Sequence, residues 1–465
     1  MTTPIPMPAP APPPTPLPDA RREFATDVVR RLRGAGFQAL WAGGCVRDLI
    51  LGLSPNDFDV ATDARPEQVT DLFRKRTIPV GESFGVVRVR GPHGSGLEVE
   101  VATFRSDGIY LDGRRPESVV FSSPQLDAER RDFTINGMFL DPLTGEVLDY
   151  VGGRADLGAK VLRAIGDPSA RFREDKLRLL RAVRFAARFG LSIDPATHAA
   201  VVAMADQVPV VAAERIAQEL RRMLVHDSRA DAMGLMTSTG LMAAVAPDVV
   251  AMKGLFQGKP VQPEGDLWDH TLLVLSLLPP EPSFPLAFAA LLHDIGKPRT
   301  KSVEQGRFHF HNHEVVGREI ADVIARQLKL STAERERALW LVEFHQYLGE
   351  ATRMREAKLK RILAEPGIEE LLALHLADAL ASTGDTSQVD YCVSYLTSQP
   401  AGPIKPEPFV SGHDLVRHGL RPGPHFKTIL EAVYEAQLER RLTGKCEALE
   451  WIDRKIAAGK LPGGV

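Results

Sequence analysis

Apolar residues recur at every second position in several short segments of the N-terminal third of the chain, and at helical spacing in the segments between them. The first pattern predicts strands at residues 38–44, 57–62, 85–91 and 97–104. The second predicts helices at 20–37, 46–52 and 67–73. The segment PHGSG (92–96) is expected to connect the last two strands as a hairpin. Together these elements predict a small mixed α/β domain.

Beyond residue 151 the alternating pattern disappears and helical periodicity dominates, as in REDKLRLLRAVRFAARFG (173–190) and AAERIAQELRRMLV (212–225). Clusters of proline and glycine interrupt it near 245–265, 279–285 and 399–424. The predicted fold class is therefore multidomain α/β + α. The predicted parts are a disordered proline-rich tail (1–20), an α/β head (21–150) and helical segments at 151–255, 256–385 and 386–465.

Composition is ordinary for a globular protein. A length of 465 residues predicts more than one core, and 44% hydrophobic with 25% charged residues is unremarkable. No signal peptide is expected in residues 1–18, and PPEP (279–282) breaks the longest apolar stretch, so no membrane span is expected. The three cysteines match no disulfide or zinc spacing and fit a reducing cytoplasm. The net charge of −3 excludes a generally basic nucleic-acid binder, although 168–190 is locally basic.

Two aspartates one residue apart point to metal chemistry. Alternation in the predicted strand 57–62 places Asp57 and Asp59 on one face, away from the apolar residues. Hard cations such as Mg²⁺ bind carboxylate oxygens, and nucleotidyl transfer uses two of them to bridge the attacking hydroxyl and the leaving oxygens. A neighbouring strand would supply a third carboxylate, with Glu100 as first choice and Glu98 in reserve. An Asp-x-Asp pair alone is also common at solvated strand ends.

The segment WAGGCVRDLILG (41–52) directly precedes these aspartates. Gly43 and Gly44 would let backbone N–H groups approach a triphosphate at the start of a helix, and Arg47 would add a charge-assisted contact. A glycine pair before a helix is, on its own, usually only a turn. The order and spacing of glycines, arginine and aspartates together predict a nucleotide site.

The run GGCVRDLILGLSPNDFDVAT (43–62) resembles the first motif of the class II tRNA nucleotidyltransferases, the CCA-adding enzymes, and of the related bacterial poly(A) polymerases. The similarity continues through FRSDGIYLDGRRPESVVFS (104–122), ERRDFTINGMFLD (129–141) and residues 173–190, and it covers nearly all of the chain after residue 25. It implies a polymerase-β-type nucleotidyltransferase head, followed by a mainly helical neck, a body and a tRNA-binding tail.

The resemblance also implies roles for individual residues. It places Mg²⁺ on Asp57 and Asp59. It assigns the triphosphate and ribose of the nucleotide to Gly44, Arg47, Arg131, Asp132 and Asn136. The substrates that it implies are tRNA, CTP and ATP.

The EDxxR element of this family, which is implied to select the base without a template, is here Glu174, Asp175 and Arg178, with Arg181 one turn on. Residues 174, 178 and 181 have the spacing of one face of one helix. An arginine and a carboxylate together can donate to and accept from the Watson–Crick edge of cytosine or adenine. A solvated arginine face is the alternative interpretation.

The polar, glycine-containing segment FRSDGIYLDGRRP (104–116) is predicted to be a mobile loop over the site. The resemblance implies that this loop helps to change specificity from C to A, with contacts from Asp112, Arg114 and Arg115. An ordinary surface loop is the alternative.

A second constellation follows in the order His270, His293-Asp294, His313, His345 and Asp378, which resembles an HD domain, a helical metal-dependent phosphohydrolase fold. Imidazole and carboxylate ligands suit a divalent transition metal. Two roles stay open for residues 256–385. One is hydrolysis of 2′,3′-cyclic phosphates or phosphomonoesters, and the other is a structural body that supports tRNA.

Addition of CCA to tRNA is the leading functional hypothesis. A bacterial poly(A) polymerase shares the head motifs, but the basic GRRF of that group is replaced here by GESF (81–84). An enzyme that adds only CC or only A is a narrower variant, and the intact loop at 105–116 argues against CC-only addition. HD-type hydrolysis as the main activity and a non-enzymatic RNA-binding scaffold are the remaining alternatives.

Overall fold

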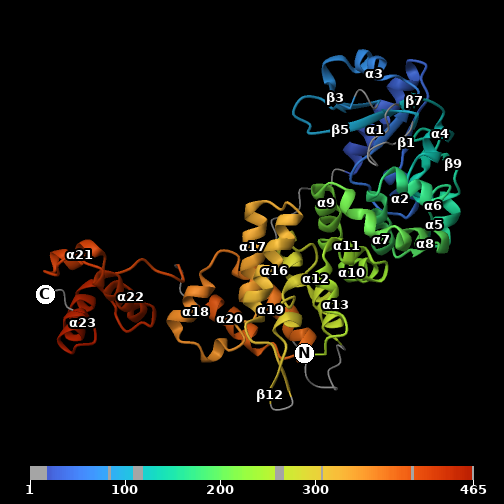
Figure 1. Ribbon diagram of the computed structural model, residues 1–465. Helices are drawn as coiled ribbons and strands as arrows, with labels where there is room; N and C mark the ends of the chain where they lie inside the picture. The colour runs from blue at the N-terminus through green and yellow to red at the C-terminus, as the bar shows by residue number, and fades with distance from the viewer. Residues whose placement is uncertain are drawn as a thin grey trace. The chain divides into compact units, whose positions relative to one another are not determined.

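The computed structural model describes residues 18–81, 85–107, 119–256, 266–304, 307–398 and 403–462 (Figure 1). The chain divides into two compact units. The first comprises the residues up to Gly254 together with Val323–Thr332, and the second comprises Leu255–Asp322 and Ala333–Val465. Within the described ranges, no helix combines the length and the apolar character needed to cross a membrane. The finer division into five parts stays a prediction.

A mixed sheet of seven strands forms the head of the first unit, in the order β3-β4-β5-β2-β1-β8-β9. These strands are β1 (Ala39–Ala42), β2 (Asp59–Thr62), β3 (Thr77–Gly81), β4 (Val86–Arg90), β5 (Glu98–Thr103), β8 (Met138–Leu140) and β9 (Val147–Asp149). Only β2 and β5 are parallel neighbours, and the other pairs of adjacent strands are antiparallel. The short strands β6 (Arg105–Asp107) and β7 (Val119–Phe121) pair separately.

Helices α1 (Pro18–Gly34) and α3 (Pro66–Phe73) pack against this sheet, and α2 (Gly44–Ile50) packs against β1 and β8. All four residues of the inner strand β1 are buried, whereas buried and accessible residues alternate along β5. Leu40, Phe104 and Phe139 belong to one apolar cluster of the head. The predicted mixed α/β head is confirmed, although β2 starts at Asp59, two residues later than expected.

The rest of the first unit is mainly helical, as predicted. Its α-helices are α4 (Pro124–Glu129), α5 (Gly153–Gly158), α6 (Pro168–Glu174), α7 (Leu177–Phe189), α8 (Pro195–Ala203), α9 (Ala213–Leu224), α10 (Arg229–Ser238), α11 (Leu241–Val245) and α12 (Pro247–Val250). Its 3₁₀ helices are η1 (Arg74–Arg76), η3 (Thr134–Asn136) and η4 (Ala205–Val210). This mainly helical part also contains two short strands, β10 (Val161–Leu162) and β11 (Ser192–Ile193), which pair in parallel. Strands of two residues are too short to show a periodic pattern.

The second unit is also mainly helical. It contains α13 (Leu267–Leu277), α14 (Phe284–Leu292), α15 (Lys297–Thr300), η5 (Ala351–Arg353), α18 (Glu356–Leu363), α19 (Ile368–Ser382), α20 (Ser387–Ser398), α21 (Gly412–Arg417), α22 (His425–Leu438) and α23 (Lys445–Ala457). Two further helices belong to it in part: α16 (His313–Gln327) continues into the segment Val323–Thr332 of the first unit, and α17 (Thr332–Phe344) starts at the last residue of that segment. A short antiparallel hairpin of β12 (Ser302–Glu304) and β13 (Arg307–His309) precedes α16. Ile429, Val433 and Ile452 belong to a separate apolar cluster near the C-terminus.

Candidate active site

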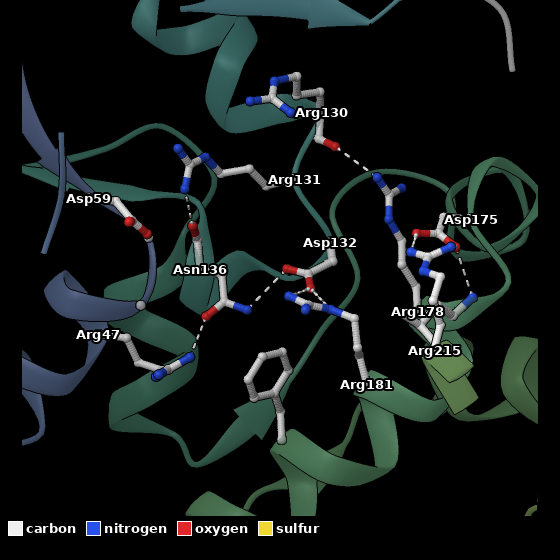
Figure 2. A pocket seen from close by; sticks show the side chains of 14 residues that line it. Arg47, Asp59, Arg130, Arg131, Asp132, Asn136, Asp175, Arg178, Arg181 and Arg215 are labelled. Carbon is white, nitrogen blue, oxygen red and sulfur yellow. Dashed lines mark hydrogen bonds and ion pairs between the residues drawn. The ribbon is translucent and has the colours of Figure 1, made fainter. Parts of the chain in front are cut away.

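A cavity of about 450 Å³ lies in the first unit, where β2, α2, α7 and α9 contribute side chains (Figure 2). Six arginines and three aspartates face it. Its wall consists of Gly43, Gly44, Arg47, Asp59, Arg130, Arg131, Asp132, Asn136, Asp175, Leu177, Arg178, Arg181, Phe185 and Arg215. The volume is typical of a small-molecule site, and the excess of positive charge suits a polyphosphate.

Ten of the residues predicted from the sequence line this cavity. They are Gly43, Gly44, Arg47, Asp59, Arg131, Asp132, Asn136, Asp175, Arg178 and Arg181. Asp57, Glu100 and Glu174 are not part of its wall. Asp112, Arg114 and Arg115 lie outside the described residues.

Sequence reasoning missed four residues of the wall, namely Arg130, Leu177, Phe185 and Arg215. Arg130 adjoins the predicted Arg131, and Phe185 lies one helical turn after Arg181, so the motif and its helical spacing contained a signal for both. Arg215 is 40 positions away from its partner Asp175 and comes from another helix. No local pattern predicts such a long-range contact.

A continuous hydrogen-bond chain crosses the floor of the cavity. Nη1 of Arg47 donates to Oδ1 of Asn136 at 2.6 Å, and Nδ2 of Asn136 donates to Oδ1 of Asp132 at 3.0 Å. Nε of Arg181 donates to Oδ2 of Asp132 at 2.7 Å. Asp132 therefore connects the half-buried Arg181 directly, and the buried Arg47 through Asn136, although these side chains come from segments far apart in the sequence.

Aromatic rings support the same two arginines. The Arg47 guanidinium lies 4.3 Å from the ring centroid of Phe189, and that of Arg181 lies 5.1 Å from the ring of Phe185. Such cation–π contacts hold a guanidinium in place without using up its hydrogen-bond donors. Both side chains thus keep donors available for a ligand.

The environment of Asp132 fixes its ionised state. Burial alone would raise the pKa of its carboxyl group, but the charge of Arg181 and hydrogen bonds from Asn136 and Arg181 lower this pKa to about 2. An ionised carboxylate at this position accepts hydrogen bonds only.

Asp59 has the opposite electrostatic environment. Enclosure in the cavity wall and the negative charge of Glu100 raise the pKa of Asp59 to about 6, and Asp57 contributes in the same direction. The parallel register of β2 and β5 places Glu100 directly opposite Asp59. A cation bound between these carboxylates would relieve their mutual repulsion, so the donor set fits a hard divalent ion.

The register also separates the two candidates for the third carboxylate. Glu100 faces Asp59, whereas Glu98 pairs with Arg90 across β4 and β5 at 3.2 Å. Arg88 contacts both glutamates, at 3.0 Å from Glu100 and 3.3 Å from Glu98. Glu100 is therefore the better placed of the two.

The glycine turn before α2 allows a close approach of backbone and side chain. Gly43 has a φ of 73°, and a Cβ atom there would lie 2.7 Å from Nη1 of Arg131. Arg131 in turn donates to the backbone oxygen of Asn136 at 3.2 Å and to Asp127 at 3.0 Å. A side chain at position 43 would push Arg131 out of the cavity wall.

The EDxxR element does not lie on one helix, contrary to the prediction from its spacing. Glu174 ends α6, Asp175 is extended with a φ of −145°, and α7 starts at Leu177. Oδ1 of Asp175 accepts a hydrogen bond from the backbone N–H of Leu177 at 3.0 Å, which stabilises this break. Glu174 still contacts Arg178 at 2.6 Å, but from the preceding helix.

Residues outside the EDxxR element orient its two cavity-lining side chains, Asp175 and Arg178. Arg215 binds Asp175 through two hydrogen bonds of 2.8 and 3.3 Å. Nη2 of Arg178 donates to the backbone oxygen of Arg130 at 3.3 Å (Figure 2). A fixed carboxylate and a fixed guanidinium thus face the same cavity.

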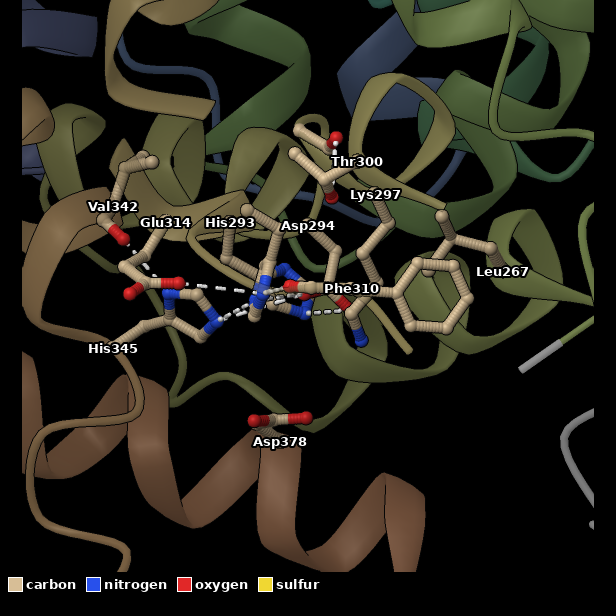
Figure 3. Close-up of polar contacts among 12 residues, drawn as sticks. Leu267, His293, Asp294, Lys297, Thr300, Phe310, Glu314, Val342, His345 and Asp378 are labelled. Carbon is tan, nitrogen blue, oxygen red and sulfur yellow. Dashed lines mark hydrogen bonds and ion pairs between the residues drawn. The ribbon is translucent and has the colours of Figure 1, made fainter. Parts of the chain in front are cut away.

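The second unit brings all six predicted metal ligands together. Figure 3 labels four of them, His293, Asp294, His345 and Asp378. His270, His293 and Asp294 form one buried triad, and Asp294, His313 and His345 form another. Asp378 on α19 contacts Nε2 of His270 at 3.2 Å. Asp294 is common to both triads, so this HD cluster offers two adjacent ligand sets.

The donor atoms of this HD cluster fit a divalent ion. Oδ1 of Asp294 is buried and has no hydrogen-bond partner, although Nε2 of His313 and of His345 lie 3.3 and 3.5 Å away. Burial would raise the pKa of Asp294, but the positive charges of Lys297 and His293 hold it well below its usual range. A buried, ionised and partly unsatisfied carboxylate among imidazoles is the chemistry of a metal site.

Three protein families match parts of the chain. They are "Poly A polymerase head domain" at residues 39–163, "Probable RNA and SrmB- binding site of polymerase A" at 190–252 and "HD domain" at 268–383. These matches confirm the expected polymerase-type head and HD domain.

Curated relatives carry one common description. A CCA-adding enzyme of Geobacillus thermodenitrificans is 42% identical over 218 residues, which are 47% of this chain and 53% of that protein. The chain thus spans about half the length of this relative and of others at similar identity. A CCA-adding enzyme of Lactobacillus helveticus is 31% identical over 445 residues, or 92% of this chain and 95% of that protein.

A solved structure agrees with these relatives. The Bacillus stearothermophilus CCA-adding enzyme in complex with CTP matches with a TM-score of 0.73 and 26% identity, over 95% of this chain and 98% of that one. The similarity therefore extends along almost the whole of both chains. The chain belongs to the family of the CCA-adding enzymes.

Proposed function

We propose that the protein adds C, C and A to the 3′ end of tRNA, using CTP and ATP and no nucleic-acid template. The observation that carries this proposal is that one cavity holds Asp59 on one side and the pair of Asp175 and Arg178 on another, with arginines between them. Its relatives of this family bear the name of that activity. A reacting centre, a phosphate site and a base-reading pair are thus within reach of a single nucleotide.

In the reaction, the tRNA 3′-hydroxyl attacks the α-phosphorus of CTP or ATP. A new O–P bond forms, the bond to the β-phosphate breaks, and pyrophosphate leaves. Arg47 and Arg131 would bind the triphosphate, and Asp132 and Asn136 would orient the ribose. Asp59, with Asp57 and Glu100 nearby, would hold Mg²⁺, which stabilises charge on the attacking and leaving oxygens when bound.

Base selection follows from hydrogen-bonding chemistry. Cytosine and adenine each present an exocyclic amine beside an unprotonated ring nitrogen, whereas uracil and guanine present a carbonyl beside a ring N–H. Asp175 accepts from the amine, and Arg178 donates to the ring nitrogen. A uracil or guanine edge would leave the carboxylate facing an oxygen, which is repulsive.

The test uses three tRNAs that end before CCA, after C and after CC, each incubated with Mg²⁺ and CTP, ATP or both. Growth to a defined CCA end on all three, read on a sequencing gel, is the expected result. Extension of only some of them would identify a CC- or A-adding enzyme. Long ladders with ATP alone on any RNA would identify a poly(A) polymerase and overturn the proposal.

Replacing Arg215 by alanine is expected to relax base selection. Asp175 would lose its two hydrogen bonds from Arg215 and become free to rotate. The ratio of kcat/KM for CTP over UTP should fall about tenfold, since a hydrogen bond to a charged group is worth about 1.5–3 kcal/mol. Arg222→Ala, on the same helix but outside the cavity wall, is the matched control and should keep the wild-type ratio.

For the second unit we infer a metal-dependent phosphohydrolase activity on 2′,3′-cyclic phosphates or phosphomonoesters. The buried, partly unsatisfied Asp294 shared by two ligand triads supports this candidate. The cluster would hold divalent transition-metal ions, which supply a nucleophilic hydroxide when bound. Asp378 and Asp294, which contact Nε2 of His270 and of His313, would share the ions with these imidazoles.

Purified protein is expected to hydrolyse 2′,3′-cAMP or p-nitrophenyl phosphate when Ni²⁺, Co²⁺ or Mn²⁺ is added, and to lose this activity with a chelator. Asp378→Asn should reduce the hydrolysis at least about tenfold, because the loss of a carboxylate ligand should cost no less than the 10–100-fold typical of groups that only orient a ligand. The thermal unfolding temperature of this variant serves as the folding control. If neither substrate is hydrolysed with any of the three metals, the proposed activity is wrong and the HD cluster has a structural role.

We also propose a cytoplasmic location. Cys45, Cys392 and Cys446 are all free thiols, as expected in a reducing compartment.

A further inference from the structure

The β12–β13 hairpin carries a third group of metal-ligand side chains, separate from the HD cluster. It consists of Glu304 on β12, His309 at the end of β13 and His311 just beyond it. Their donor atoms all lie within 4.8 Å of one another. Nε2 of His311 is 3.5 Å from Oε1 of Glu304, and the two imidazole rings stack with centroids 5.4 Å apart.

The strand register explains why these three side chains gather. Ser302 pairs with His309 and Glu304 pairs with Arg307, so Glu304 and His309 lie on the same face of the hairpin. His311 lies two residues beyond the end of β13, and its ring stacks on that of His309, so it joins the same group. Three donors on one face of a short ribbon can close on an ion by side-chain rotation alone.

The alternate residues point away from this group. The amino group of Lys301 lies 3.9 Å from the ring of Phe308, and that of Lys297 lies 5.7 Å from the ring of Phe310. These contacts anchor the opposite face of the segment and so fix which way the histidines point. His309 and His311 therefore lie side by side and are not split between the two faces of the segment.

The group differs from the HD cluster in exposure. Glu304 and His311 are exposed and His309 is half-buried, whereas His293, His313 and His345 are buried. Two imidazoles and a carboxylate suit Zn²⁺, Ni²⁺ or Cu²⁺, and three protein ligands leave a position for water. The ligands are thus of the right type, number and accessibility for a surface metal site.

We propose that Glu304, His309 and His311 bind one divalent transition-metal ion on the hairpin, independently of the HD cluster. The HD cluster suits a divalent transition-metal ion as well, but the ion on the hairpin would be in contact with solvent.

The test measures how many ions the full-length protein binds. Metal-free wild type and the double variant H309A/H311A are dialysed against Zn²⁺, and bound zinc is determined per chain. The variant is expected to bind one equivalent less than wild type, and Glu304→Gln should weaken binding of that equivalent. Equal zinc content in wild type and H309A/H311A would overturn the proposal.

His413→Ala is the matched control, because His413 is also exposed but belongs to none of the ligand groups found in the described part of the chain. It should bind as much zinc as wild type. An equal loss of zinc in this control would mean non-specific binding to surface histidines and would also overturn the proposal. Identical thermal unfolding of all variants without metal checks that the exposed substitutions leave the fold intact.

Discussion

Replacing Asp59 by alanine is expected to lower kcat/KM for incorporation of CTP and ATP by about 10³-fold or more. The reason is that a metal ion held at the reacting phosphate is worth several kcal/mol of transition-state stabilisation, and each 1.36 kcal/mol is tenfold in rate. Asp59 faces the cavity, and Glu100 lies opposite it in the parallel register. The loss should appear in kcat for single-nucleotide addition to a tRNA that ends before CCA.

Binding of tRNA separates this effect from misfolding. The Asp59→Ala variant should bind tRNA as wild type does in a filter assay, because it loses only the metal ligand. Asp57→Ala is expected to behave in the same way, although Asp57 lies just before β2 and outside the cavity wall. Asp71→Ala, an exposed acid on α3, is the matched control. Retained turnover in both Asp57→Ala and Asp59→Ala would show that the metal site lies elsewhere.

Replacing Asp132 by alanine is expected to destabilise the first unit by about 1.5–3 kcal/mol, which is the usual contribution of hydrogen bonds to a charged group. Asp132 is 7% exposed, and its loss would leave the Arg181 guanidinium without its carboxylate. Asn136 would lose the same acceptor and with it the alignment of Arg47. A lower midpoint of urea unfolding and a higher KM for CTP should both result.

A double-mutant cycle tests whether the loss of stability in Asp132→Ala comes from the ion pair with Arg181. Asp132→Ala combined with Arg181→Ala should cost less than the sum of the single substitutions, because the double variant leaves no uncompensated charge. Additive losses would mean that the two side chains act independently.

The lowered pKa of Asp132 fixes the direction in which stability changes with pH. Because the folded-state pKa of Asp132 is lowered to about 2, its ionised form stabilises the fold above the ordinary aspartate pKa of about 3.9. This stabilisation is lost as the pH falls from about 4 toward about 2. Asp132→Asn should therefore lose less stability than wild type over that interval in urea unfolding.

Local patterns in the sequence determined the class of fold and most of the wall of the cavity. The alternation around Asp59 placed its carboxylate on the accessible face of a strand, and the glycine turn placed Arg47 within the short helix α2 that follows it. Six ligand-type residues in the order of an HD domain predicted the buried HD cluster. In each case the chemistry depends on neighbours in the chain or on motifs of fixed order, which a sequence displays directly.

Only the tertiary structure decided which of these residues meet. The register of β2 and β5 selected Glu100 over Glu98, and strand pairing is a non-local property. The helix break at Asp175 contradicted the helical spacing, because a side chain-to-backbone hydrogen bond overrides periodicity there. Arg215 reaches Asp175 from a different helix, and Glu304 reaches His311 across a hairpin. Contacts between distant segments depend on packing and pairing in three dimensions, so no spacing in the sequence encodes them.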